Sequence, residues 1–188
     1  MENSQIVNLM WRGPYPLRGI ESKLTSLSEE DAKGQGVYLH CLETEKEYDV
    51  VYIGKADSII DRQGQHAYML EHKRYSLVNV NSFRAGKGLD IMWIPDYGMG
   101  EPDNKLVQSN IDAFTVYFAK VKEVPPLIVE GALQVHFWRK MDTRRFLLTQ
   151  KISGWSYRGK IRNEIPNDIK PIRGLDDIID LQASPNLP

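Results

Sequence analysis

The sequence contains a single cysteine, Cys41, which narrows the chemistry open to the chain. One thiol cannot form an internal disulfide, and a thiolate metal site would need cysteine partners that are absent. His40, His72 and His136 show no recognisable metal-ligand spacing. Cys41 stands in an apolar run, and we therefore expect it to be a buried strand residue.

Long hydrophobic runs are missing as well. No stretch approaches the roughly 20 apolar residues that a membrane-spanning helix needs. The first residues, MENSQIVNLMWRG, lack the order of charged, apolar and small residues that marks a secretory signal peptide. We expect a cytoplasmic protein with no membrane partner.

The motifs of several enzyme classes are also absent. The chain has no glycine-rich phosphate loop and no nucleophile elbow, which disfavours a small-molecule enzyme. It has no internal repeat and no recognisable zinc finger or helix-turn-helix module. A length of 188 residues, with 41% hydrophobic and 26% charged residues, fits one globular domain with short additions.

Positive charge is concentrated in the last third of the chain. Between residues 139 and 162, eight basic residues stand against one acid, Asp142. The basic residues are Arg139, Lys140, Arg144, Arg145, Lys151, Arg158, Lys160 and Arg162. Aromatic residues such as Trp155 lie among them, and this mixture suits contact with a nucleic-acid backbone, because cations displace counterions while rings stack on bases. A solvated basic face would have the same composition.

Two short runs of β-forming residues, 37–43 and 49–55, flank the polar loop TEKEY and predict a β-hairpin. Alternation along the second strand places Val50 and Tyr52 on one face. The same alternation allows Tyr38, on the first strand, to share that face. The hairpin therefore predicts two tyrosines side by side.

The segment after the hairpin predicts a helix over residues 57–75, begun by a capping box of Ser58 and Asp61. Arg62 and His66 stand four residues apart there. They therefore emerge on the same face of the helix, one turn from each other.

Further elements follow from local composition. Residues 88–95, GLDIMWIP, predict a third strand that ends at Pro95. Residues 104–120 and 125–140 predict two helices, the second opened by a proline pair. Residues 1–33 predict an irregular arm, because glycine and proline are too dense there for a helix.

Several of these residues, taken in order, resemble the GIY-YIG nuclease family. The residues that carry the resemblance are Gly36-Val37-Tyr38, Tyr52-Ile53-Gly54-Lys55, Arg62, His66 and Glu130. The resemblance covers roughly residues 34–140. A lone Tyr-Ile-Gly would be weak, whereas the ordered set is fairly specific.

The resemblance implies an α/β fold. A small catalytic domain over residues 34–142 would contain a three-stranded antiparallel sheet flanked by helices. The long interval before Glu130 implies an insertion near 96–119. Residues 1–33 would form an N-terminal arm, and residues 143–188 a C-terminal extension that is first basic and then acidic.

The family also implies metal-dependent hydrolysis of phosphodiester bonds. Glu130 would hold Mg²⁺ or Mn²⁺ through a carboxylate oxygen, with water and phosphate completing the shell. Arg62 would clamp the scissile phosphate with its planar guanidinium group. Tyr52 would position water or phosphate from the same face.

Tyr38 would contact the attacking water as a general base, or relay its proton to one. A free tyrosine titrates near ~10, so this role requires neighbouring cations that favour the phenolate. Lys55, His66 and the metal are the candidates.

Two positions leave alternatives open. Glu101 or Glu123 could take the metal role in place of Glu130, although neither stands in a comparable apolar helix. The asparagine that many family members carry after the glutamate helix could correspond to Asp142 or to Asn163.

The sequence therefore predicts an endonuclease that cleaves double-stranded DNA. A compact chain with an arm, an insertion and a basic extension fits a site-specific restriction endonuclease. A palindromic site would imply a two-fold homodimer. The alternative is a nucleic-acid-binding module that kept the fold and lost catalysis, which predicts that one of the principal polar residues is missing; all are present.

Overall fold

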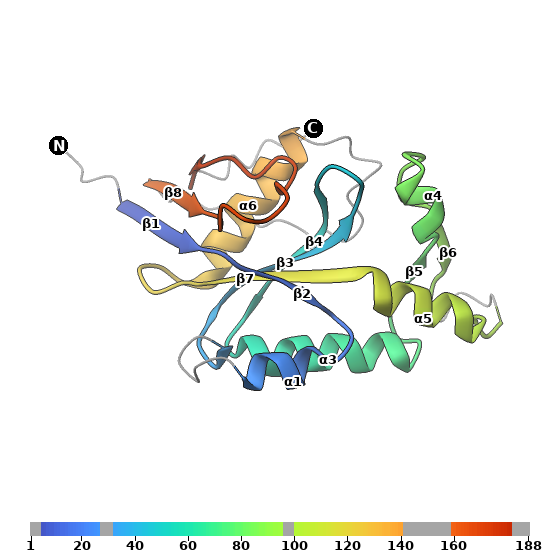
Figure 1. The fold of residues 1–188 in the computed structure, drawn as a ribbon. Coiled ribbons are helices and arrows are strands. Elements are labelled where there is room, and N and C mark those ends of the chain that lie inside the picture. Colours follow the sequence, from blue (N-terminus) through green and yellow to red (C-terminus); the bar gives the residue numbers. More distant parts are fainter. Residues whose placement is uncertain (1–4, 27–31, 96–99, 141–158, 182–188) are drawn as a thin grey trace.

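The computed structural model describes residues 5–26, 32–95, 100–140 and 159–181. In chain order its elements are β1 (Gln5–Met10), β2 (Arg12–Pro16), α1 (Ile20–Thr25), β3 (Gly36–Glu43), β4 (Tyr48–Ala56), α3 (Ile59–Glu71), β5 (Leu77–Val78), α4 (Val80–Arg84), β6 (Ile91–Trp93), α5 (Asn104–Ala113), β7 (Phe114–Lys120), α6 (Pro126–Lys140), β8 (Gly159–Glu164) and β9 (Ile178–Asp180). They form a layered α/β structure, in which a central sheet separates α1, α3 and α5 from α6 and a second sheet (Figure 1). None of the described helices is long and apolar enough to cross a membrane.

The central sheet has four antiparallel strands in the order β2-β7-β3-β4. β3 lies inside the sheet and is buried on both faces. Val37, Leu39 and Cys41 pack toward α6, whereas Tyr38 and Leu42 pack toward α3. Two hydrophobic cores therefore form, one on each side of β3, and the prediction that Cys41 is a buried strand residue is confirmed.

The predicted hairpin is confirmed, with β3 and β4 paired along their length. A β-bulge interrupts the pairing, because Cys41 pairs with Val50 and His40 pairs with Tyr52, which leaves Val51 as the extra residue. Val50 packs in the core beside α6, whereas Val51 and Tyr52 pack toward α3. The prediction that Val50 shares the face of Tyr52 is therefore wrong, while the two tyrosines do share a face.

The strand predicted within residues 88–95 is confirmed as β6, but it does not join the sheet of the hairpin, and the helix predicted over 104–120 is confirmed only over α5. Residues 88–95 contribute only β6, which pairs with β5 in a separate two-stranded sheet. The second neighbour of β3 is β7, which lies within residues 104–120, where the sequence predicts one helix. α5 ends at Ala113, and the aromatic and β-branched residues that follow are buried between β2 and β3. A continuous apolar run fits a buried strand or a buried helix, so its periodicity alone does not separate the two.

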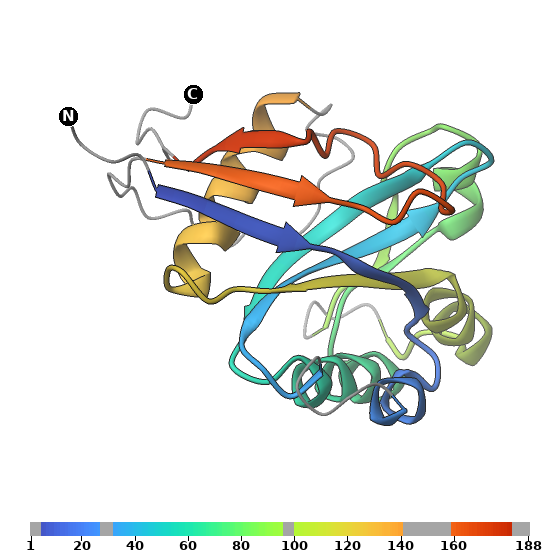
Figure 2. The ribbon, with the colours of Figure 1, turned by 60° about the vertical axis from the view of Figure 1, so that its left-hand side comes forward.

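The N-terminal segment is not an irregular arm. β2 forms an edge of the central sheet, where Pro14 and Pro16 are tolerated because an edge strand leaves backbone donors unused. β1 pairs in parallel with β8, which pairs with β9, so the two ends of the described chain lie side by side (Figure 2). Val7 and Leu9 from this second sheet pack into the same core as α6.

The helices that flank the hairpin begin near the predicted residues. The helix predicted over 57–75 runs over Ile59–Glu71, and the Ser58 hydroxyl accepts from the backbone N–H of Asp61 at 3.5 Å. Gly64 faces α1, where a Cβ would collide with the carboxylate of Glu21. α6 begins at Pro126 and packs its buried side on β3 and β4.

Candidate active site

A cleft of about 670 Å³ opens beside β4, between the first turns of α3 and α6. Four of the six residues predicted for the site line it. They are Tyr52 and Lys55 from β4, Arg62 from α3 and Glu130 from α6. β4 ends the central sheet, and among the described residues only Ile172 bridges its outer side, at Tyr48. The later part of β4 therefore presents its edge to the cleft. We call this cavity the active cleft.

The other two predicted residues, Tyr38 and His66, lie behind the active cleft. Tyr38 is fully buried, and its hydroxyl lies 2.7 Å from Nε2 of His66. Nε of Arg62 donates to the same hydroxyl at 3.4 Å. The rings of Tyr38 and Tyr52 lie 5.9 Å apart. The two tyrosines thus form an inner and an outer layer of one site, joined to the cleft by Arg62.

Gly54 has a steric role in this arrangement. It is the cross-strand partner of Tyr38. A Cβ at position 54 would collide with the Tyr38 hydroxyl and would lie 2.9 Å from Cε1 of Tyr52. The glycine after the second tyrosine therefore leaves room for the Tyr38 side chain to cross β4 and reach α3.

Burial controls the charge of the inner layer. It raises the pKa of Tyr38, the neighbouring Tyr52 raises it further, and the Arg62 hydrogen bond offsets only part of the rise. Burial also lowers the pKa of His66 to about 2, so this imidazole is neutral. The expectation that a cationic His66 favours the Tyr38 phenolate is therefore wrong. In the tautomer that carries its proton on Nδ1, His66 accepts the hydrogen bond from a neutral Tyr38.

The sequence pattern missed two residues of this inner layer, His40 and Gln63. The ring of His40 lies 4.7 Å from that of His66, and its Nε2 lies 2.8 Å from Oε1 of Gln63. Burial lowers the pKa of His40 to about 4. The signal that could have identified His40 is its position two residues after Tyr38, on the same face of β3.

Two buried neutral histidines predict a loss of stability in mild acid. His40 and His66 titrate near ~6.5 in an unfolded chain, whereas burial lowers their folded pKa values to about 4 and about 2. The unfolded state therefore binds more protons below pH ~6.5, and the full stability present above that pH is lost as the pH falls toward the folded values. Each histidine contributes about 1.4 kcal/mol per pH unit in that window.

Urea unfolding at pH 7, 6 and 5 measures this slope. The free energy of unfolding of the double variant His40→Gln, His66→Gln is expected to fall less steeply with decreasing pH, because the contribution of the two histidines to the slope is removed. The control His72→Gln changes a histidine that stacks on Tyr68 at the surface, and it measures how much a His-to-Gln substitution outside the inner layer changes stability. The same pH slope in the double variant and the wild type would contradict neutral burial of these rings.

Glu130 lies at the wall of the active cleft with 7% of its surface exposed. Burial raises the pKa of its carboxyl group, while the charge and a backbone hydrogen bond of Lys55 act in the opposite direction, as does Arg62. One turn later, Nε2 of Gln134 donates to the Ile53 carbonyl oxygen at 3.4 Å. This contact fixes α6 against β4, so the carboxylate has a defined position facing Lys55.

The donor set limits how a metal ion could bind. Within the described ranges, no three His, Cys, Asp or Glu side chains are grouped as metal ligands. A cage built only from protein groups does not fit this site. One carboxylate at the wall of a polar cleft does fit Mg²⁺ or Mn²⁺ bound mainly by water and substrate phosphate, with Glu130 as the protein ligand.

The two alternative carboxylates lie elsewhere. Glu101 forms a 3.2 Å ion pair with Lys73, and neither residue lines the active cleft. Glu123 follows β7 and lines a different cavity. Glu130 is therefore the only one of the three glutamates that lines the active cleft.

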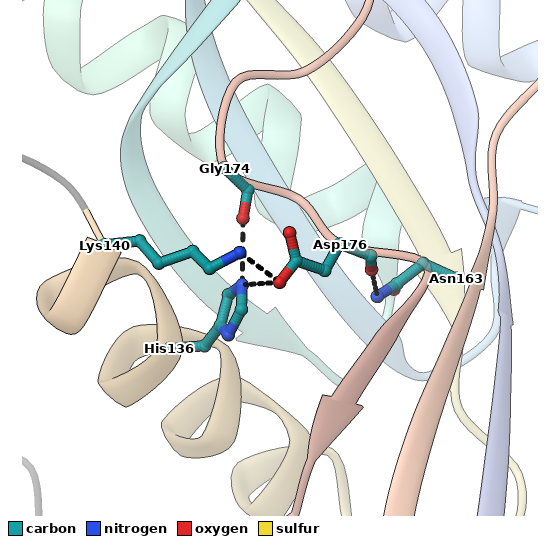
Figure 3. A network of polar contacts seen from close by, with 5 residues as sticks. All are labelled: His136, Lys140, Asn163, Gly174 and Asp176. Atoms are coloured by element: carbon teal, nitrogen blue, oxygen red, sulfur yellow. Dashed lines mark hydrogen bonds and ion pairs between the residues drawn. The ribbon is translucent and has the colours of Figure 1, made fainter.

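Asn163, one of two candidates for the family's asparagine, has a structural contact instead. Its Oδ1 accepts from the indole N–H of Trp11 at 2.9 Å, and its Nδ2 donates to the Asp176 carbonyl oxygen at 2.7 Å. Figure 3 shows the Asp176 carboxylate on the opposite side, facing His136 and Lys140 of α6. The network ties the end of α6 to the C-terminal segment, away from the active cleft. Asp142, the other candidate, lies outside the described residues.

The predicted basic surface is described only in part. Arg144, Arg145, Lys151 and Arg158 lie outside the described residues. Lys140 forms an ion pair with Asp176 and stands ten residues after Glu130, about 15 Å along the axis of α6. Arg139 is exposed at the same helix end, and Lys160 and Arg162 are exposed on β8. None of these four described cations lines the active cleft.

No protein-family model, curated protein or solved structure matches the chain. The functional assignment therefore depends on the residues of the site and on their geometry.

Proposed function

We propose that the protein is a metal-dependent endonuclease of the GIY-YIG type that hydrolyses phosphodiester bonds of double-stranded DNA. The observation that carries the proposal is the convergence of Tyr52, Lys55, Arg62 and Glu130 on one cleft. These residues come from a strand and two helices that are distant in the sequence. Hydrolysis of a phosphodiester needs cationic groups at the phosphate, a carboxylate and a proton acceptor, and this cleft combines them.

Arg62 and Lys55 bind the scissile phosphate. The guanidinium group of Arg62 is held by the Tyr38 hydroxyl and by the side-chain oxygen of Gln65, one helical turn away. This places a planar, permanently charged group in the lining of the cleft, and its shape suits two phosphate oxygens. Lys55 adds a second positive charge on the side of Glu130.

Tyr38 and His66 handle the proton of the attacking water. The Tyr38 hydroxyl is buried beneath Arg62, so a water reaches it only when Arg62 turns from its 3.4 Å contact toward a bound phosphate. Tyr38 then accepts a proton from the water as its own proton passes to Nε2 of His66, 2.7 Å away. A phosphate anion near the site raises the proton affinity of His66, which offsets the effect of burial.

Tyr52 and Glu130 complete the site. Tyr52 lines the cleft in front of Tyr38 and positions the water or a phosphate oxygen through its hydroxyl. Glu130 would hold the Mg²⁺ or Mn²⁺ ion. The bound ion supplies charge stabilisation at the phosphate and at the leaving oxygen.

The proposed enzyme is a site-specific restriction endonuclease of the cytoplasm. The segment between α3 and β7 adds β5, α4, β6 and α5 beside the core, and the strands from both chain ends add a second sheet. These additions give a compact chain further surface with which to contact DNA. If its recognition site is palindromic, a homodimer with matching two-fold symmetry binds it.

Cleavage is expected only in the presence of a divalent cation, because Glu130 offers a hard oxygen ligand and no soft ligands. Purified protein incubated with plasmid DNA and Mg²⁺ or Mn²⁺ is expected to produce linear or nicked DNA, and excess EDTA is expected to abolish the products. Undiminished cutting in EDTA would exclude the metal dependence. DNA binding without cutting, on methylated and unmethylated DNA alike, would favour the alternative of a binding module that has lost catalysis.

A further inference from the structure

A second cavity, of about 270 Å³, lies at the opposite edge of the central sheet. We call it the second cleft. Three cations from three segments line it: Arg12 from β2, Lys120 from β7 and Lys122 from the loop before α6. None of them belongs to the basic stretch that the sequence pattern singles out.

Strand register relates the second cleft to the active cleft. Gly36 of β3 pairs with Lys120 on one side and with Ala56 on the other. Ala56 lines the active cleft, and Lys120 lines the second cleft. Neighbouring strands lie about 4.8 Å apart, so these two residues are separated by about 10 Å across one end of the sheet. That distance is the rise of about three phosphates along one strand of DNA.

Glu123, the one acidic residue among the described residues that line the second cleft, holds the loop in place. Its carboxylate accepts from the backbone N–H of Lys122 at 3.3 Å. Its carbonyl oxygen accepts from Nε2 of Gln5 at 2.9 Å, which joins the loop to β1. Figure 2 shows β1 passing beside this loop. Two hydrogen bonds therefore hold the loop that carries Lys122, one within the loop and one to β1.

We infer that the second cleft binds a backbone phosphate of the same DNA duplex, a few nucleotides from the phosphate in the active cleft. The inference rests on the proposed nuclease function. Three cations converge on the second cleft, which supports the inference. One of them, Lys120, is also connected to the active cleft through the paired residues Gly36 and Ala56. Lys140, from the basic stretch, forms an ion pair with Asp176 at the far end of α6 and lines neither cleft. The path of the DNA then crosses the end of the central sheet where β4 and β7 terminate.

The test is DNA binding by Lys122→Gln, measured by fluorescence anisotropy with a labelled duplex in EDTA between 50 and 200 mM salt. Loss of one phosphate contact is expected to weaken binding several-fold at low salt and to reduce the slope of log K against log salt by about 1. Lys120→Gln is measured in parallel. Arg12 and Lys120 also interact with other parts of the chain, so thermal unfolding of each variant is recorded.

Lys46→Gln is the matched control, because Lys46 is exposed in the turn between β3 and β4, at the end of the hairpin opposite the one where Gly36 pairs with Lys120 and Ala56. It is expected to keep the wild-type affinity and salt slope. Wild-type affinity and salt slope in both Lys122→Gln and Lys120→Gln would overturn the inference that the second cleft binds a phosphate. DNA cleavage by the wild-type protein would in that case leave the proposed function standing. Absence of any duplex binding by the wild type would overturn both.

Discussion

Glu130→Gln is expected to lower the single-turnover rate of DNA cleavage by about 10³-fold or more, the scale on which removal of a central electrostatic group acts. Glutamine keeps the size of the side chain but removes the charge that would bind the metal ion. Binding to DNA is expected to change little, because affinity is spread over many phosphate contacts. The rate is measured with enzyme in excess over a defined duplex, and affinity is measured in EDTA.

Stability separates a catalytic role from a structural one. Burial raises the pKa of Glu130 despite the opposing charges of Lys55 and Arg62, so the surroundings disfavour the charged carboxylate. Glu130→Gln should therefore unfold at the same temperature as the wild type or above it. Glu101→Gln, which removes an exposed carboxylate paired with Lys73, serves as the control and should cut at the wild-type rate. If Glu130→Gln cuts normally, the site is misplaced.

Tyr38→Phe is expected to reduce the cleavage rate by about 10²-fold or more, as removal of a general base does. The ring still fills its place between β4 and α3, but His66 loses the hydroxyl 2.7 Å from Nε2 and Arg62 loses one of its two partners. The unpaired imidazole also costs about 1–3 kcal/mol of folding free energy. Single-turnover rates between pH 6 and 9 report the catalytic effect, and urea unfolding reports the effect on stability.

Tyr117→Phe is a matched control for Tyr38→Phe. Tyr117 is equally buried, lies on the neighbouring strand β7 and packs edge-on against Tyr48 in the core beside α6. Its hydroxyl is not part of the active cleft, so this variant should keep the wild-type rate. Tyr52→Phe should lose less than Tyr38→Phe, because water in the cleft can replace a hydroxyl that only positions. Equal rates for all of these proteins would assign the two tyrosines of the site to packing.

Local signals in the sequence were sufficient for the hairpin and for the two helices of the site. The hairpin follows from two β-rich runs around a polar loop, and α3 begins where Ser58 caps it. α6 begins at Pro126, as the proline pair predicts. These features depend on residues within a few positions of each other, which is why a pattern can predict them.

The pairing of strands that are distant in the chain could not be predicted from local sequence patterns. β7 is a strand because it lies between β2 and β3, and its apolar run alone suits a helix equally well. β1 and β2 each pair with a strand that is about a hundred residues or more away in the chain. The bulge at Val51 changes which face of the sheet Val50 occupies, and the residue types at the bulge do not predict it.

The site shows the same division. The ordered residues from Tyr38 to Glu130 predicted a single site, and four of them line one cleft with Tyr38 and His66 behind it. The charge state of the inner layer was not predictable, because it depends on how completely α3 covers β3. His40 and Gln63 were missed for the same reason: buried polar residues without a motif become visible only when their neighbours are known.

Sequencing of the DNA ends produced by the protein tests the central claim most directly. Pooled genomic DNAs, methylated and unmethylated, are incubated with Mg²⁺ and either the wild type, Glu130→Gln or Arg62→Ala, all purified in the same way. A nuclease built on the active cleft predicts ends that cluster at one short sequence in the wild-type sample and are missing from both variant samples. No new ends with the wild type, or the same ends with all three proteins, would contradict it.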